Sequence, residues 1–294
     1  MMKKILFATD FSKNAEKAFH FALKIAEKHK ADLVMLHVFA SPPVWGHPYI
    51  ADPAEMARQA VISYESKLQE LFEQFNSKLM PKFIAVENSS VIKGILSVVK
   101  KHQPDLVITG VKGKNLLKEI FIGSTTKALL KKSPVPLLAI PENAYYRTFK
   151  KVIYTSDLQN TDLTSLEQLI EFVKPYKPEI KVVHICTDGS YIDHEKMEWF
   201  KDLVKENISY KHISFDLLLA DNIFTRLNTY VKENDFDLIV MLEREHTGTF
   251  ERLFHEDLVW KMEFNTSIPL LSYNARNLHA AAEKDIKNGD KIEY

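Results

Sequence analysis

The stretch KKILFATDFSKNAEKA, residues 3–18, returns in altered form as KKVIYTSDLQNTDLTS at residues 150–165. Both copies contain two lysines, an apolar run, a Thr or Ser and then an Asp, so that Asp10 corresponds to Asp157. Solenoid repeats have periods of about 20 to 50 residues, and the separation between these two copies is far longer. The repeat therefore indicates that a whole domain has been duplicated.

Three further segments repeat in the same order in the two halves of the chain. They are ADLVMLHVFA (31–40) with EIKVVHICTD (179–188), HQPDLVIT (102–109) with NDFDLIVM (234–241), and SPVPLLAIPE (133–142) with SIPLLSYN (267–274). A chain of 294 residues also exceeds the size at which a single core usually stops growing. We predict domains at 1–147 and 148–278, followed by a C-terminal tail at 279–294.

Short apolar runs alternate with longer amphipathic stretches in each copy. The runs are rich in Val, Ile and Leu without strict alternation, which is typical of strands buried on both faces. Strands are predicted at 5–9, 33–38, 83–86, 105–110 and 135–140, and helices at 15–26, 53–79 and 89–102, the last capped by Ser89 or Ser90. This order predicts an α/β fold of two tandem Rossmann-like domains, each a mostly parallel five-stranded sheet with helices on both faces.

The two halves of the chain carry opposite charges, although the whole chain is neutral. Residues 1–147 contain 21 Lys and Arg against 13 Asp and Glu, whereas residues 148–294 contain 18 against 26. We expect the two domains to attract one another and any anionic ligand to bind the first. A chance difference between two solvated surfaces is the alternative.

The composition favours a cytoplasmic protein. A single cysteine, Cys186, cannot form a disulfide framework. The opening MMKKILFATDF lacks the features of a signal peptide, and no apolar run approaches the roughly 20 residues of a membrane span. Scattered lysines without interleaved aromatic residues argue against nucleic acid as a partner.

The stretch GVKGKNLLKEIFIGST (110–125) is the candidate ligand loop. Gly110 ends a predicted strand, at the place where a doubly wound sheet presents its ligand crevice. Gly110 and Gly113 are expected to adopt positive φ and to let backbone N–H groups approach a ligand closely. Gly123 precedes a helix that opens with Ser124, and such helix N-termini favour phosphate. Each glycine could instead serve only a turn, and Ser124 only an N-cap, but their combination favours a phosphate site.

The spacing Gly110-x-x-Gly113, nine residues, Gly123-Ser124 resembles the G-2x-G-9x-G-[ST] nucleotide motif of the universal stress protein family. The strand that ends in Thr9-Asp10 and the run Ser-Pro-Val-Pro at 133–136 resemble that family as well. The resemblance implies ATP, with or without Mg, at the carboxyl edge of the sheet. The residues that it assigns to the ligand are Thr9, Asp10, Val38, Gly110, Gly113, Gly123, Ser124, Thr125 and Thr126. Asp10 could instead only end a strand and cap a helix.

The second copy departs from this motif in its loop LEREHTGTFERLFHEDL (242–258). Leu and Glu stand where the first two glycines should be, and His255-Glu256-Asp257 replaces Ile-Gly-Ser. We therefore predict that the second domain does not bind ATP and instead pairs with the first. The resemblance implies that the last strands, VPLLAI and IPLLSY, pair antiparallel within the chain, and a homodimer is a further candidate assembly.

An ATP-binding regulatory module in a stress response is the function that these features favour. ATP or ADP would be the ligand, and a protein of unknown identity would be the partner. Any hydrolysis would be slow, because no catalytic base or arginine finger stands near the loop. The alternatives are a structural interaction protein with a vestigial site and an adenylating enzyme. FATDFSKN lacks the SGGxDS-type loop that the enzyme would need. His37 and His184 are interpreted as structural, and the acidic loop around His246 and His255 is not predicted to bind a metal.

Overall fold

The computed structural model describes residues 2–41, 52–111, 124–187, 191–243 and 267–276, which form two compact units. The first unit contains the described residues up to Glu142, and the second contains those from Asn143 onward. The predicted tail at 279–294 lies outside the described residues. None of the helices in the described ranges combines the length and the apolarity needed to cross a bilayer.

The first unit is a parallel sheet in the order β3-β2-β1-β4-β5. Its elements are β1 (Lys4–Ala8), α1 (Lys13–His29), β2 (Asp32–Phe39), α2 (Pro53–Glu73), β3 (Lys82–Glu87), α3 (Val91–His102), β4 (Leu106–Val111), α4 (Ser124–Lys132) and β5 (Leu137–Pro141). The strand order reverses between β1 and β4, which creates the switch point at which such sheets bind ligands.

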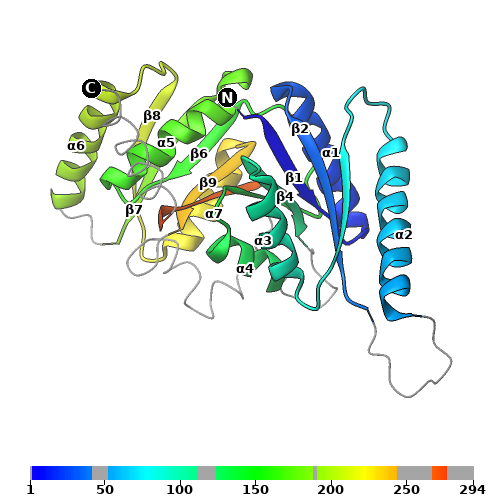
Figure 1. The fold of residues 1–294 in the computed structure, drawn as a ribbon. Helices are drawn as coiled ribbons and strands as arrows, with labels where there is room; N and C mark the ends of the chain where they lie inside the picture. The colour runs from blue at the N-terminus through cyan, green and yellow to red at the C-terminus, as the bar shows by residue number, and fades with distance from the viewer. Residues whose placement is uncertain (1, 42–51, 112–123, 188–190, 244–266, 277–294) are drawn as a thin grey trace, which may run out of the picture. The chain divides into compact units, whose positions relative to one another are not determined.

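Helices cover both faces of this sheet, as Figure 1 shows. On β2, the ring of His37 lies 4.5 Å from that of Tyr64 in α2, whereas the neighbouring Val38 faces Gly94 in α3. Because successive side chains of a strand point to opposite faces, α2 and α3 cover opposite faces. The ring of Phe19 in α1 lies 6.4 Å from that of Phe72 in α2, so α1 shares the face of α2. The predicted fold class is confirmed for this unit.

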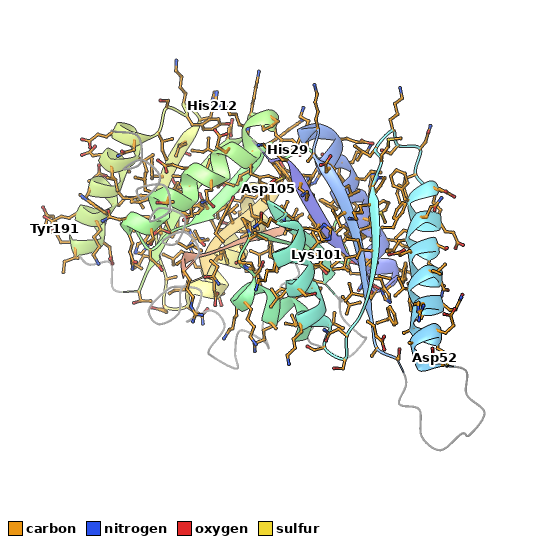
Figure 2. All side chains as sticks on the ribbon, viewed as in Figure 1. His29, Asp52, Lys101, Asp105, Tyr191 and His212 are labelled. Atoms are coloured by element: carbon orange, nitrogen blue, oxygen red, sulfur yellow. The ribbon has the colours of Figure 1, made fainter. Side chains whose placement is uncertain are left out.

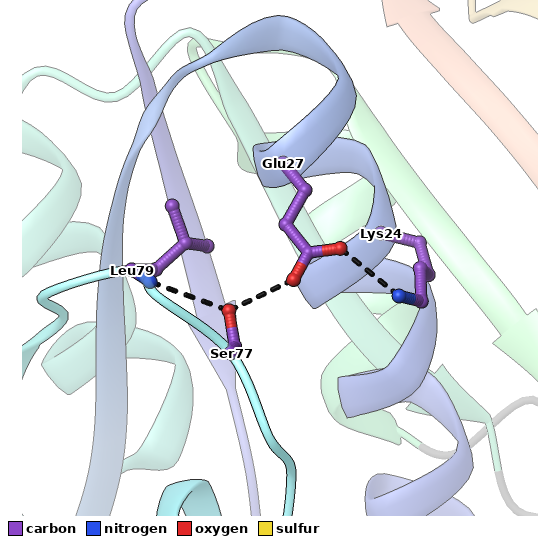
Figure 3. Close-up of polar contacts among 4 residues, drawn as sticks. All are labelled: Lys24, Glu27, Ser77 and Leu79. Atoms are coloured by element: carbon purple, nitrogen blue, oxygen red, sulfur yellow. Dashed lines mark hydrogen bonds and ion pairs between the residues drawn. The ribbon is translucent and has the colours of Figure 1, made fainter.

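The end of α2 differs from the prediction, which continued the helix to residue 79. The helix ends at Glu73, and the chain then runs beside α1 (Figure 3). Ser77 Oγ accepts a hydrogen bond from Leu79 N at 3.3 Å and donates one to Glu27 Oε1 at 2.8 Å. Burial opposes ionisation of Glu27, but hydrogen bonds from Lys24 and Ser77 outweigh it and lower the pKa of this carboxyl group. Local hydrogen bonds by serine compete with helical ones, and here they help to turn the chain toward β3.

The second unit repeats the same topology in the order β8-β7-β6-β9-β10, again with parallel strands. Its elements are β6 (Lys151–Thr155), α5 (Asn160–Val173), the 3₁₀ turn η1 (Lys174–Tyr176), β7 (Glu179–Cys186), α6 (Tyr191–Asn207), β8 (Ile213–Leu219), α7 (Ile223–Asn234), β9 (Leu238–Glu243) and β10 (Leu270–Asn274). In the second unit, β6–α5 corresponds to β1–α1, β7–α6 corresponds to β2–α2, and α7 corresponds to α3. The duplication inferred from the sequence is therefore a duplication of fold.

Unusual backbone details recur at equivalent positions in the two units. Within the described ranges, the non-glycine residues with positive φ fall into three equivalent pairs, which are Phe11 with Leu158, Lys30 with Lys177, and Gln103 with Asp235. Asp105, labelled in Figure 2, accepts hydrogen bonds from the backbone N–H groups of Lys3 and Lys4, and Asp237 accepts them from Lys150 and Lys151. Left-handed backbone is uncommon outside glycine, so its recurrence supports a common origin of the two units.

Candidate functional site

A pocket of about 250 Å³ lies at the carboxyl edge of the first sheet. The ends of β1, β2 and β4 contribute to its wall, together with residues near the amino ends of α1, α3 and α4. The lining residues are Ala8, Thr9, Asp10, Ser12, Asn14, Ala15, Leu36, Val38, Val91, Ile95, Thr109, Gly110, Thr125 and Thr126. The pocket thus lies where the strand order reverses, which is the expected place for a ligand in this architecture.

Six of the nine residues predicted for the ligand site line this single pocket. They are Thr9, Asp10, Val38, Gly110, Thr125 and Thr126. Ser124 begins α4, but its side chain lies outside the described part of the structure. Gly113 and Gly123 fall in a segment outside the described residues. The structure therefore brings together residues that are more than 100 positions apart in the sequence, through parallel strands that end at the same edge.

The structure explains the glycine at position 110 differently from the prediction. Its φ lies outside the positive range, so the expected left-handed backbone is wrong at this position. A Cβ atom at Gly110 would instead stand 3.0 Å from the carbonyl oxygen of Asn14 and 3.2 Å from the N of Ala15. Both atoms belong to the backbone of the first turn of α1. The missing side chain thus allows β4 to lie directly against the amino end of that helix.

The turn between β1 and α1 is held by its own side chains. Thr9 Oγ1 accepts from Phe11 N at 3.0 Å, and Asp10 Oδ1 accepts from Ser12 N at 3.0 Å. Ser12 is the N-cap of α1 and accepts a hydrogen bond from Ala15 N. Asp10 therefore has a structural task in shaping this turn, and Ser12, not Asp10, caps the helix.

His37 is packed beneath this turn. Its Nδ1 lies 2.9 Å from Thr9 O, and the rings of Phe11 and Tyr64 lie 4.6 and 4.5 Å from the imidazole. Burial lowers the pKa of His37, although the contact with Thr9 and the charge of Asp10 act in the opposite direction. His184 makes the equivalent contact to Ser156 O at 2.7 Å. Both contacts suit the structural role predicted for these histidines.

Sequence reasoning missed several residues of the pocket wall. Ser12 and Asn14 come from the first turn of α1, and Val91 and Ile95 come from α3. The sequence could have predicted the two residues of α3. Val91 and Ile95 stand four residues apart directly after the N-cap Ser90, which places both side chains on the same face at the start of the helix. A helix that begins at the carboxyl edge of a sheet turns the side chains of its first turns toward the crevice.

Comparison with known proteins agrees with this geometry. The model of the universal stress protein family matches residues 1–141, which include every residue of the pocket wall. The first unit is therefore similar to the universal stress protein family over nearly its whole length. The family resemblance inferred from the glycine spacing is thereby confirmed.

Curated universal stress proteins match the same half of the chain. Universal stress protein MJ0577 of Methanocaldococcus jannaschii is 29% identical over 154 residues, which cover 48% of this chain and 95% of that protein. A universal stress protein of Thermus aquaticus is 25% identical over 150 residues, covering 48% of this chain and 99% of that protein. The matching segment therefore corresponds to nearly a whole protein in each relative.

A solved structure extends the similarity of fold to both units. The crystal structure of a universal stress protein from Archaeoglobus fulgidus covers 92% of this chain and 98% of its own, with a TM-score of 0.62 and 16% identity. A putative universal stress protein from Pseudomonas aeruginosa covers 96% of this chain and 97% of its own, with a TM-score of 0.61 and 14% identity. At these identities the likeness establishes the fold, and the two tandem α/β domains are confirmed.

The second unit differs from the first at the positions equivalent to the pocket. Leu242 occupies the place of Gly110, and Asp162 occupies that of Ala15. Asp162 is fully buried, and its carboxyl oxygens accept hydrogen bonds from Tyr154 Oη at 2.8 Å and Gln159 N at 2.9 Å. A buried acid group in the first turn of α5 disfavours an anionic ligand beside it. The acidic loop 244–258 lies outside the described residues.

Proposed function

We propose that the first unit binds ATP in the pocket at its carboxyl edge, and that nucleotide occupancy regulates a stress-response interaction. The observation that carries this proposal is the convergence of six predicted ligand residues on one pocket in a universal stress protein domain. The proposed ligand residues also include Gly113, Gly123 and Ser124, by the family motif alone. ADP is proposed as a second ligand of the same site, and Mg as a companion of the phosphates.

The composition of the pocket suits a nucleotide. Leu36, Val38, Val91 and Ile95 provide an apolar wall from β2 and α3. Asp10, Ser12, Asn14, Thr125 and Thr126 add polar groups from the turn after β1, from α1 and from α4. The amino ends of α1 and α4 border the pocket, and helix N-termini favour phosphate. Few polar groups placed within a largely apolar concavity are typical of a cofactor site.

The pocket suits binding better than turnover. Asp10 is the one ionisable side chain among the described residues of its wall, and it is exposed and engaged in the turn before α1. A general base would have to lie within hydrogen-bond reach of an attacking water. We therefore expect any hydrolysis of ATP to be slow. Bound ATP would add a large polyanionic group to this edge of the sheet and so alter the surface there.

We also propose that the second unit does not bind ATP. Leu242 places a side chain where the first unit has none, and Asp162 places a carboxyl group where the first unit has the methyl of Ala15. The described structure of this unit supports the same conclusion as its loop sequence, which replaces the motif glycines. One nucleotide per chain is the expected stoichiometry.

Isothermal titration of ATP into the full chain tests both proposals. We expect one binding event per chain, and we expect Gly113→Glu to weaken it by at least about tenfold, or ~1.4 kcal/mol, because a carboxylate would enter the phosphate loop. Circular dichroism of the variant should show an unchanged fold. Absence of binding by the unaltered chain would contradict the proposed function. A stoichiometry of two would contradict only the proposal for the second unit.

A further inference from the structure

Gly94 is the fourth residue of α3 and lies on the buried face of this helix with Ile95 and Val98. A glycine in a helix interior costs about 1 kcal/mol relative to alanine, so its presence in a regular, well-capped helix requires a structural reason. The helix is otherwise built for stability, with Ser90 as its N-cap and Lys100, Lys101 and His102 in its last turn. The reason lies in the strand beneath it.

The space that a side chain at Gly94 would need is filled by Val38. A Cβ atom at Gly94 would stand 2.5 Å from Cγ1, 2.9 Å from Cγ2 and 3.3 Å from Cβ of Val38. Valine is stiff at χ1, and Val38 is 8% exposed in β2, between β1 and β3. Rotation of Val38 cannot relieve all three contacts, so α3 would have to move away from β2 to accept even a methyl group.

The same helix and strand form the apolar wall of the pocket. Val91 and Ile95 precede and follow Gly94 on α3, and both line the pocket together with Val38. We propose that Gly94 is a positioning residue for the nucleotide pocket, because its missing side chain seats α3 on β2 and thereby sets the width of the apolar wall. This inference rests on the proposed binding of ATP to the first unit.

The second unit does not have a glycine at the equivalent position. The N-caps Ser90 and Asn222 and the C-caps Gln103 and Asp235 align α3 with α7, so that Arg226 corresponds to Gly94. Ile185 of β7 corresponds to Val38. The guanidinium of Arg226 lies 5.7 Å from the centroid of the Tyr230 ring and 3.8 Å from Glu233 Oε2. A long side chain thus stands where the first unit has only hydrogen, which adds a third difference between the two units to those at Gly110 and Ala15.

The affinity of the full chain for ATP, measured by titration calorimetry, tests the role of Gly94. We expect Gly94→Ala to weaken binding by about tenfold or more at a temperature where the variant is folded. The double variant Gly94→Ala/Val38→Ala removes the two clashing methyl groups, so we expect it to bind ATP as tightly as Val38→Ala alone. Such rescue would show that Gly94 and Val38 are strongly coupled, and a general loss of stability would not produce it.

Ser97→Ala provides the matched control, because Ser97 is an exposed residue of α3 whose hydroxyl group donates a hydrogen bond within the helix, to Gly94 O at 2.7 Å. We expect it to bind ATP like the unaltered chain. Unchanged affinity in Gly94→Ala, or independent losses in the double variant, would overturn the role of Gly94 while leaving the proposed function intact. If Gly94→Ala does not fold, comparison of the double variant with Val38→Ala decides the question. Failure of the unaltered chain to bind ATP would instead overturn the proposed function itself.

Discussion

Gly110 and Gly94 are needed because neighbouring groups occupy the space that a side chain would take. At Gly110 the neighbours are backbone atoms of Asn14 and Ala15, which cannot rotate away as a side chain could. At Gly94 the neighbour is the branched side chain of Val38. Both glycines lie where a helix approaches a strand that lines the pocket. A single hydrogen atom in place of a methyl group thus decides how closely the elements around the site can pack.

We predict that Gly110→Ala destabilises the chain by about 1–3 kcal/mol, because the added methyl group would press on the first turn of α1. Where the backbone suits alanine, the same substitution usually stabilises a protein by about 0.4–1 kcal/mol, so even the sign of the effect is informative. Urea denaturation followed by circular dichroism measures the change in the free energy of unfolding. An increase in stability would show that β4 and α1 are not in close contact.

The amino ends of the helices connect the sheet to the pocket. Ser12 is the N-cap of α1 and Ser90 is the N-cap of α3, and each side chain accepts a hydrogen bond from the first turn of its helix. The sequence offered either Ser89 or Ser90 as the cap of α3, and the structure selects Ser90, whose Oγ accepts from Lys93 N at 3.4 Å. Because Val91 directly follows this cap, the start of α3 also places part of the apolar wall.

We expect Ser90→Ala to lower the free energy of unfolding by about 1 kcal/mol, through loss of the N-cap hydrogen bond. Ser89→Ala is the matched control, since Ser89 is the exposed neighbour, and its effect should stay within about 0.5 kcal/mol. Thermal and urea unfolding of the two variants provide the comparison. Equal effects of the two substitutions would show that the helix is capped in another way.

Across the whole molecule, one fold occurs twice with two different carboxyl edges. The two units share strand order, left-handed residues and the aspartates that hold the start of the sheet. They differ where the first unit has its pocket, because Leu242, Asp162 and Arg226 add side-chain atoms to the equivalent region. The scaffold has thus been retained while the residues at its ligand edge have changed, as expected when function resides in a site and not in a fold.

We predict that ATP protects only the first unit from hydrogen exchange. Peptides that contain residues 8–15, 36–39 and 109–111 should exchange more slowly in the presence of ATP, since bound ligand stabilises the elements around it. Peptides that contain the equivalent residues 155–162, 183–186 and 241–243 should be unaffected, and they serve as the internal control. Mass spectrometry of the full chain, with and without ATP, gives the comparison. Protection of both sets would contradict the assignment of a single site.

The fold class, the duplication and part of the ligand edge could be predicted from the order of residues alone. Apolar runs located the strands, and strand–helix alternation implied parallel strands that end at one edge. Gly110 could therefore be placed at that edge from the end of its predicted strand, whereas Thr9 and Val38 were assigned to the ligand through the family resemblance. The family motif added Thr125 and Thr126 at the start of the next helix.

How closely each helix packs on the sheet could not be predicted in this way and is known from the folded structure. The contacts of Gly94 with Val38 and of Gly110 with Asn14 join residues far apart in the chain, and they depend on the distance between a helix and a strand. Periodicity reveals which face of a helix is buried but not how closely it approaches its neighbour. The apolar wall from Val91 and Ile95, and the packing role of both glycines, follow from that distance. These features required the packed molecule, since close packing is a property of all its elements together.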